Sequence, residues 1–123
     1  MDTNIKLLGV VPVLPSQDIS RDILWYKEKA GFETLFADKM YACIYRENIY
    51  LHLQWHADTP DDPLLGGSVI RIFVKNIQTI FDEFVARGTV ANTKLIPRTS
   101  WGTSEFGFFD LNSNAVFIVE DLD

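Results

Sequence analysis

The sequence predicts an α+β fold: two tandem βαβββ modules forming a curled mixed sheet around a cleft, with the helices on the outer face. Two observations predict this repeat. A helix-capping residue followed by isoleucine occurs at Asp18-Ile19 and again at Asn76-Ile77, and a glycine that can end a helix follows 12 or 13 residues later both times. Short apolar, β-branched stretches flank both helical stretches in the same order. Since helices and sheets each need a partner layer, each helix is expected to cover one face of a four-stranded sheet.

The first module is expected at about residues 5–56. Its first strand, Val10 to Leu14, is interrupted by Pro12 and followed by Pro15, so it should lie at a sheet edge, because proline cannot donate to a strand ladder. Apolar residues then recur at helical spacing from Ile19 until Gly31 ends the helix. Turn-like pairs separate the three strands that complete the module, predicted at residues 33–37, 40–46 and 49–55.

A linker at residues 57–67, rich in proline and glycine, separates this module from a second one at about 68–121, within a single domain of residues 1–123. The second module repeats the order. A strand is predicted at 68–74, and a helix with an apolar stripe runs from Ile77 to Gly88. Its last three strands are predicted at 90–96, 105–110 and 115–120.

Composition excludes several classes of function. The 11 Lys and Arg residues are outnumbered by 17 Asp and Glu, and this net charge of -6 without a basic stripe disfavours nucleic acid while attracting cationic molecules. The single cysteine, Cys43, excludes an internal disulfide framework and fits a small core or wall residue. Because no leader or membrane-spanning stretch is evident, we expect a cytoplasmic protein without membrane contact.

Three stretches together resemble one known family: the opening "VPVLPSQDISRDILWYKEKAGFE", the helix "VKNIQTIFDEFVARG" and the closing "SWGTSEFGFFDLNSNAVFIVED". With the doubled βαβββ order, they are similar to the vicinal oxygen chelate superfamily, also called the glyoxalase/bleomycin resistance family, and within it to the bleomycin resistance proteins. That superfamily includes metal-dependent lyases and dioxygenases as well as metal-free proteins that sequester antibiotics. The fold therefore does not decide the function, and the site must.

The resemblance also says where the enzymes of the superfamily place metal ligands. Mapped through the flanking motifs, the four positions fall on Val11, His52, Val69 and Phe117. Three of these side chains are apolar, whereas a catalytic divalent metal generally needs three N, O or S ligands. No metal and no cofactor is therefore expected.

No other catalytic residues are expected. His52 and His56 are four residues apart on a strand, so they lie roughly 13 Å apart, too far to share a metal ion. His52 is interpreted as a hydrogen-bonding pocket residue, with a structural histidine or a metal ligand as the alternatives. Glu105 is the best single candidate for a general base, but no partner for it is visible, and a structural or rim role is the preferred interpretation.

The ligand-binding residues are predicted from strand alternation. One face of the strand at 49–55 carries Tyr50, His52 and Gln54, and the opposite face is apolar. The whole predicted set comprises Tyr50, His52, Gln54, Arg71, Phe73, Trp101 and Phe117. Such a cleft favours a planar or amphipathic ligand. The neighbouring Phe106, Phe108 and Phe109 are expected in the core.

The leading hypothesis is a metal-free binding protein that sequesters a cationic aromatic antibiotic, such as a bleomycin-like compound, or a similar small molecule. In the antibiotic-binding relatives, two chains exchange their N-terminal strands and form clefts at their interface. Pro12 and Pro15 fit such an arm, so a homodimer is expected. The alternatives are a metal-dependent lyase, isomerase or dioxygenase of the superfamily, and a non-catalytic homologue with another ligand.

Overall fold

A computed structural model of the protein describes residues 3–64 and 67–123. Residues 65 and 66 of the expected linker lie outside the described residues. The elements are β1 (Val13–Ser16), α1 (Ile19–Ala30), β2 (Glu33–Ala37), β3 (Tyr41–Arg46), β4 (Ile49–Trp55), β5 (Val69–Phe73), α2 (Ile77–Ala86), β6 (Thr103–Phe109) and β7 (Ala115–Asp121).

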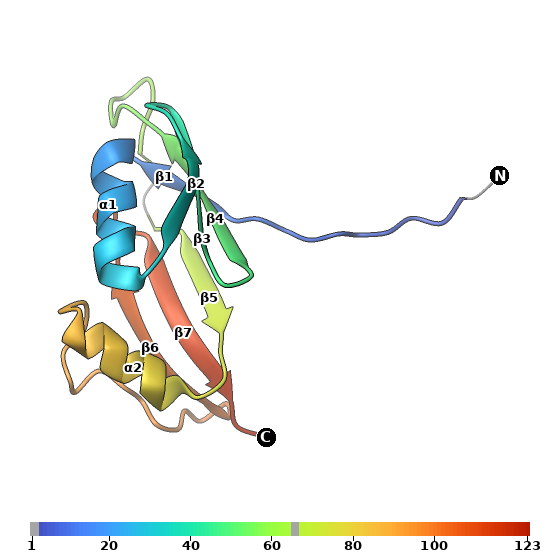
Figure 1. Cartoon of the computed structure of the whole chain (residues 1–123), viewed down its shortest axis with the longest axis vertical. Coiled ribbons are helices and arrows are strands. Elements are labelled where there is room, and N and C mark those ends of the chain that lie inside the picture. The colour runs from blue at the N-terminus through green and yellow to red at the C-terminus, as the bar shows by residue number, and fades with distance from the viewer. Residues whose placement is uncertain (1–2, 65–66) are drawn as a thin grey trace.

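The strands form two open mixed sheets, which confirms the predicted α+β class. The first sheet has the order β1-β4-β3-β2 and the second has the order β5-β7-β6. The pairs β1 with β4 and β5 with β7 are parallel, and the remaining pairs are antiparallel. Both helices lie on the same side of the molecule, α1 against the first sheet and α2 against the second (Figure 1). The opposite side of both sheets, called the helix-free face below, has no helix over it.

The two helices begin by different means. Asp18 caps α1 as predicted, since its side chain accepts a hydrogen bond from the backbone N–H of Arg21. Asn76 occupies the equivalent position before α2, but it has left-handed backbone angles and its side chain makes no capping bond. Instead, the Glu120 carboxylate reaches from β7 and accepts bonds from the backbone N–H groups of Asn76 and Ile77. A strand residue 44 positions away therefore caps α2.

Two predicted strands differ from the observed ones. The first strand is Val13–Ser16 rather than Val10 to Leu14, although it does lie at a sheet edge, as the prolines predicted. The prediction of a strand at 90–96 was wrong. Residues 91–94 form an exposed turn, and only Ile96 makes a bridge, to Glu105, so the second sheet has three strands among the described residues. The polar segment Asn92 to Lys94 offers no apolar side to bury, which is why it does not extend the sheet.

One hydrophobic core runs through both halves of the chain. Buried side chains from both helices and both sheets belong to the same cluster, and the ring of Trp25 on α1 lies 6.0 Å from that of Phe108 on β6. Phe106 and Phe108 are buried as predicted. The prediction was wrong for Phe109, which is 69% exposed, because it alternates to the helix-free face of β6.

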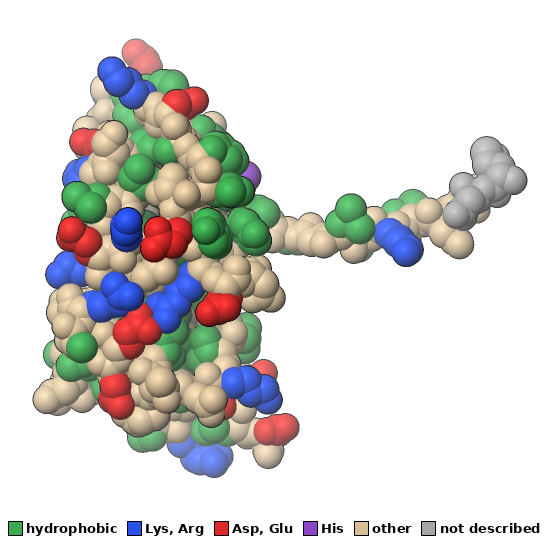
Figure 2. Space-filling model, in the orientation of Figure 1, with side chains coloured by type: hydrophobic (Ala, Val, Ile, Leu, Met, Phe, Trp, Pro, Cys, Tyr) green, Lys and Arg blue, Asp and Glu red, His purple; other side chains and the backbone are tan. Residues whose placement is uncertain are grey.

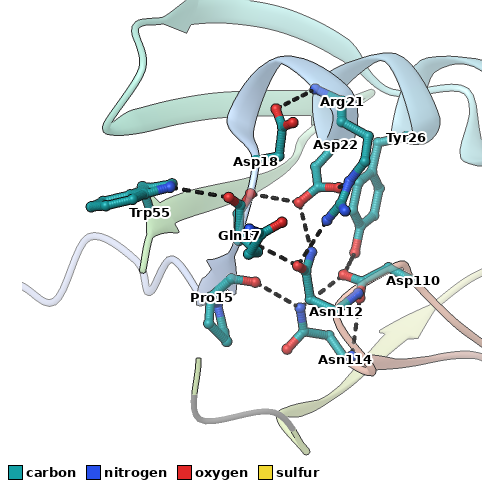
Figure 3. A network of polar contacts seen from close by, with 11 residues as sticks. Pro15, Gln17, Asp18, Arg21, Asp22, Tyr26, Trp55, Asp110, Asn112 and Asn114 are labelled. Carbon is teal, nitrogen blue, oxygen red and sulfur yellow. Dashed lines mark hydrogen bonds and ion pairs between the residues drawn. The ribbon is translucent and has the colours of Figure 1, made fainter. Parts of the chain in front are cut away.

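A buried polar network joins the β6–β7 turn to the first half of the chain (Figure 3). The Tyr26 hydroxyl donates to Asp110 over 2.6 Å, and the Asn112 amide donates to Asp22 over 2.6 Å. The Asn114 amide donates to the carbonyl oxygen of Pro15. Burial, together with the nearby charge of Asp110, raises the pKa of Tyr26 well above its usual value. The "DLNSN" turn therefore connects the second sheet to α1 and β1 through buried hydrogen bonds.

Charged side chains join the two halves on the helix side. Arg46 of β3 makes two hydrogen bonds to the Glu83 carboxylate of α2, and Arg87 makes a third. The Arg46 guanidinium holds the pKa of Glu83 below its usual value. Arg87 also donates to backbone carbonyls in the last turn of α1, at Lys27 and Glu28. Figure 2 shows this mixed band of charge crossing the middle of the molecule.

Residues 3–12, called the N-terminal arm, leave the body on the side opposite the helices (Figure 1). The arm is not part of any strand, and its leucines, Leu7 and Leu8, are 93% and 94% exposed. Figure 2 shows further apolar side chains gathered where the arm meets the body. Neither helix in the described ranges is both long and apolar enough to cross a membrane.

Candidate functional site

The helix-free face of the first sheet contains the predicted residues of β4. Leu51 and Leu53 are buried against the core, so Tyr50, His52 and Gln54 alternate to the helix-free face. This arrangement agrees with the alternation deduced from the sequence. His56, four residues beyond His52, is not part of that row of pocket candidates. It lies beyond the end of β4, and its ring hydrogen-bonds Asp62 over 2.7 Å.

Neighbouring strands hold His52 in place. Its Nδ1 atom lies 2.8 Å from the Tyr41 hydroxyl, and its ring makes edge contacts with Tyr41 and Phe36. Val13 and Cys43 are its register partners on the two flanking strands. Within the described residues its Nε2 atom has no hydrogen-bond partner, so this nitrogen can bond a ligand above the sheet. Tyr41 was not predicted as a site residue, although alternation along β3 could have placed it on this face.

The second sheet presents an aromatic surface on the same side. Arg71 and Phe73 of β5 and Phe117 of β7 alternate to the helix-free face, away from the buried residues of the core. The guanidinium carbon of Arg71 lies 5.8 Å from the centre of the Phe117 ring, a cation–π distance. On the adjacent strand, Gly107 leaves room for this ring. A Cβ atom there would lie only 2.7 Å from Phe117 Cδ1.

Glu105 is the centre of the hydrogen bonds on this sheet. Its side chain is 6% exposed and accepts bonds from Arg71 at 3.0 Å, from the Thr103 hydroxyl at 2.7 Å and from the Trp101 indole N–H at 3.3 Å. The bond from Arg71 is the main cause of a lowered pKa for Glu105. Of the two expected roles, structural or rim, this burial agrees with the structural one, because a carboxylate with this many donors is stable when covered. A carboxylate held ionised in this way is also a poor general base.

Only part of the predicted set shares one cavity. A groove of about 690 Å³ lies between the arm, the start of β4 and β5. Tyr50, Arg71 and Phe73 line it together with Val11 of the arm. The other predicted residues, His52, Gln54, Trp101 and Phe117, lie outside the lining of this groove. Within a single chain, therefore, the seven residues share a side of the molecule rather than one pocket.

The residues at the metal-ligand positions of the superfamily do not fit a metal ion. Val11, Val69 and Phe117 have no lone pairs to donate, and His52 alone cannot supply the three ligands that a catalytic divalent metal generally needs. Across residues 3–64 and 67–123, no three His, Cys, Asp or Glu side chains are grouped so that they could hold a metal ion.

The arrangement of these helices and sheets is that of the glyoxalase/bleomycin resistance fold, as comparison with solved structures shows. The chain superposes on a glyoxalase-related enzyme from Clostridium phytofermentans with a TM-score of 0.76 at 14% identity, covering 98% of this chain and 100% of that one. No protein-family model matches the sequence.

The particular proteins that the chain resembles are bleomycin-binding proteins. One is the bleomycin-binding protein of Streptomyces verticillus, solved with copper(II)-bleomycin, at 25% identity and a TM-score of 0.73 over 94% of this chain and 97% of that one. Another is the bleomycin resistance protein of Geobacillus stearothermophilus, 21% identical over 94% of this chain and 98% of the relative. The resemblance deduced from the sequence motifs is thereby confirmed.

Proposed function

We propose that the protein is a metal-free binding protein that sequesters a cationic aromatic antibiotic or a similar small molecule on the helix-free face of its sheets. The observation that carries this proposal is the exposed aromatic surface of that face. Phe73, Phe109 and Trp101 are each more than half exposed there, and the same side of the molecule carries the polar side chains of His52 and Arg71. Exposed aromatic rings offer large stacking contacts, and the bond from the Trp101 indole N–H to Glu105 limits the movement of that ring.

Charge supports the choice of a cationic ligand. The chain has a net charge of -6, which raises the local concentration of cations around it. Arg71 is the one cation in the predicted binding set, and Glu105 neutralises it. The relatives whose structures contain bleomycin support a ligand of that chemical kind.

The cleft itself is proposed to form between two chains of a homodimer in the cytoplasm. The apolar arm points away from its own body on the helix-free side, as an exchanged segment must. Among the described residues, strand β5 pairs with β7 alone, which leaves its other edge available to a second chain. The exposed apolar side chains of the arm and of the helix-free face favour a second chain that buries them. Pairing two helix-free faces would also bring residues of the first sheet close to residues of the second.

Calorimetric titration with copper(II)-bleomycin and with metal-free bleomycin tests the proposal. We expect saturable binding with one site per chain. The absence of heat at high micromolar ligand would remove bleomycin as the ligand. Loss of affinity in His52→Ala and Trp101→Ala, with none in the control Leu24→Ala on the helix side, would locate the ligand on the helix-free face. Equal effects of all three variants would contradict that location.

A further inference from the structure

The buried carboxylate of Glu105 has an unusual setting. It lies on the helix-free face, where Phe73 and Phe109 are exposed, yet its side chain is only 6% accessible because Arg71, Thr103 and Trp101 converge on it. Burying a charge is costly unless it is paired and hydrogen-bonded. Glu105 does not belong to the hydrophobic core, because its neighbours Phe106 and Phe108 face the core from the other side of β6.

Two of the three partners of Glu105, Trp101 and Arg71, are exposed groups of this face, whereas Thr103 is buried. Trp101 is 66% exposed and lies in the loop before β6, so its indole N–H bond to Glu105 is a specific restraint on its orientation. The guanidinium of Arg71 is held by the same carboxylate and lies against the Phe117 ring. One buried group thus orients both an aromatic ring and a cation.

Resting on the proposed function, we propose that Glu105 is the positioning residue that makes this half of the site accept planar cations. It orients Trp101 and Arg71, and it cancels the charge of Arg71. Without Glu105, an uncompensated guanidinium beside Phe117 would repel a cationic ligand and attract an anionic one. The charge preference of the surface is therefore set by a residue that is itself covered by its partners.

Two dyes of opposite charge test the charge preference: the planar cation thioflavin T and the anion 1-anilinonaphthalene-8-sulfonate. We expect Glu105→Gln to weaken thioflavin T binding by about tenfold, the order of one lost charge interaction, and to strengthen binding of the anionic dye. Arg71→Gln should shift the preference in the opposite direction, and Glu105→Gln/Arg71→Gln should restore much of the cation preference. The control Glu28→Gln removes the same charge from the exposed side of α1.

A parallel loss of affinity for both dyes, with additive effects in the double variant, would show a purely structural role and overturn the proposal. Wild-type protein that binds neither dye would also overturn it. The bleomycin titration stays a separate test, because binding of bleomycin without charge selectivity toward the dyes would contradict only the role of Glu105. If Glu105→Gln does not fold, Arg71→Gln alone must still show a stronger preference for the cationic dye than the wild-type protein does.

The orientation of Trp101 is tested by NMR spectroscopy of the protein without any ligand. The Trp101 indole N–H resonance, identified by its loss in Trp101→Phe, should shift and exchange faster in Glu105→Ala, which removes the acceptor. It should stay unchanged in Glu28→Gln. The indole resonances of Trp25 and Trp55 report whether the variant is folded. A Trp101 resonance that is unchanged in folded Glu105→Ala would rule out the positioning role.

Discussion

At the scale of single residues, close contacts between side chains and backbone determine the shape of the helix-free face. Gly107 lies beside the Phe117 ring, which occupies the space that a Cβ atom would need. The ring in turn supports the Arg71 guanidinium. A glycine in a strand normally weakens it, but here the missing side chain lets an aromatic ring lie against the backbone of β6.

Gly107→Ala should therefore destabilise the protein. The new methyl group would lie 2.7 Å from Phe117 Cδ1 and 2.8 Å from Cε1, so the ring must move. We expect a loss of about 1–3 kcal/mol in the free energy of unfolding, measured by urea denaturation. The matched background is Phe117→Ala, in which the same substitution should cost much less. Equal costs in the two backgrounds would show that the ring and the glycine are not coupled.

At the scale of elements, local signals explain where most helices and strands begin. Asp18 and Gly31 bound α1 as predicted, the latter with left-handed backbone angles (φ 74°) that suit glycine. The start of α2 depends instead on Glu120, which is distant in sequence. The expected strand at 90–96 does not form, because its middle, Asn92 to Lys94, is polar and makes an exposed turn, and only Ile96 forms a bridge.

Glu120→Ala should destabilise α2, because among residues 3–64 and 67–123 Glu120 is the only side chain that accepts a bond from the first N–H groups of this helix. We expect a loss of about 0.5–2 kcal/mol, the usual value of an N-terminal cap, in thermal or urea unfolding. Asp121→Ala is the control, because it removes a neighbouring, exposed carboxylate from the same strand. If both variants lose the same free energy of unfolding, the loss comes from removing a negative charge and not from removing the cap of α2.

At the scale of the whole molecule, the two helices cover one side of both sheets, and the helix-free face is the opposite, uncovered side. Both helices, the shared core and the Arg46–Glu83 pair lie on the covered side or at the junction of the halves. The uncovered side presents aromatic rings and the apolar arm. The proposed homodimer would cover this uncovered side, and the arm is the segment best placed to reach a second chain.

Removing most of the arm, up to residue 9, should therefore dissociate the proposed homodimer. A chain truncated to begin at Val10 is expected to sediment as a monomer at micromolar concentration, with its far-UV circular dichroism largely unchanged. Leu7→Asp with Leu8→Asp should have a similar effect, because both side chains must be buried by the partner. Leu24→Asp, on the exposed side of α1, is the control. A monomeric wild-type protein would overturn the dimer, and a dimer that survives truncation would overturn the role of the arm.

The sequence by itself determined the α+β class, the doubled element order and the core and helix-free faces of β4. Short-range periodicity and caps encode these features, and the polar partners of the face followed from them in part, as with Tyr50 and His52. Only the tertiary structure decided that Glu120 caps α2 and that Glu105 is covered by Arg71 and Trp101. The bonds of Glu120 to Ile77 and of Arg71 to Glu105 join residues 43 and 34 positions apart, so they leave no periodic signal and depend on the strand order β5-β7-β6. Trp101 is only four residues from Glu105, but it lies in a loop, whose conformation no periodicity predicts.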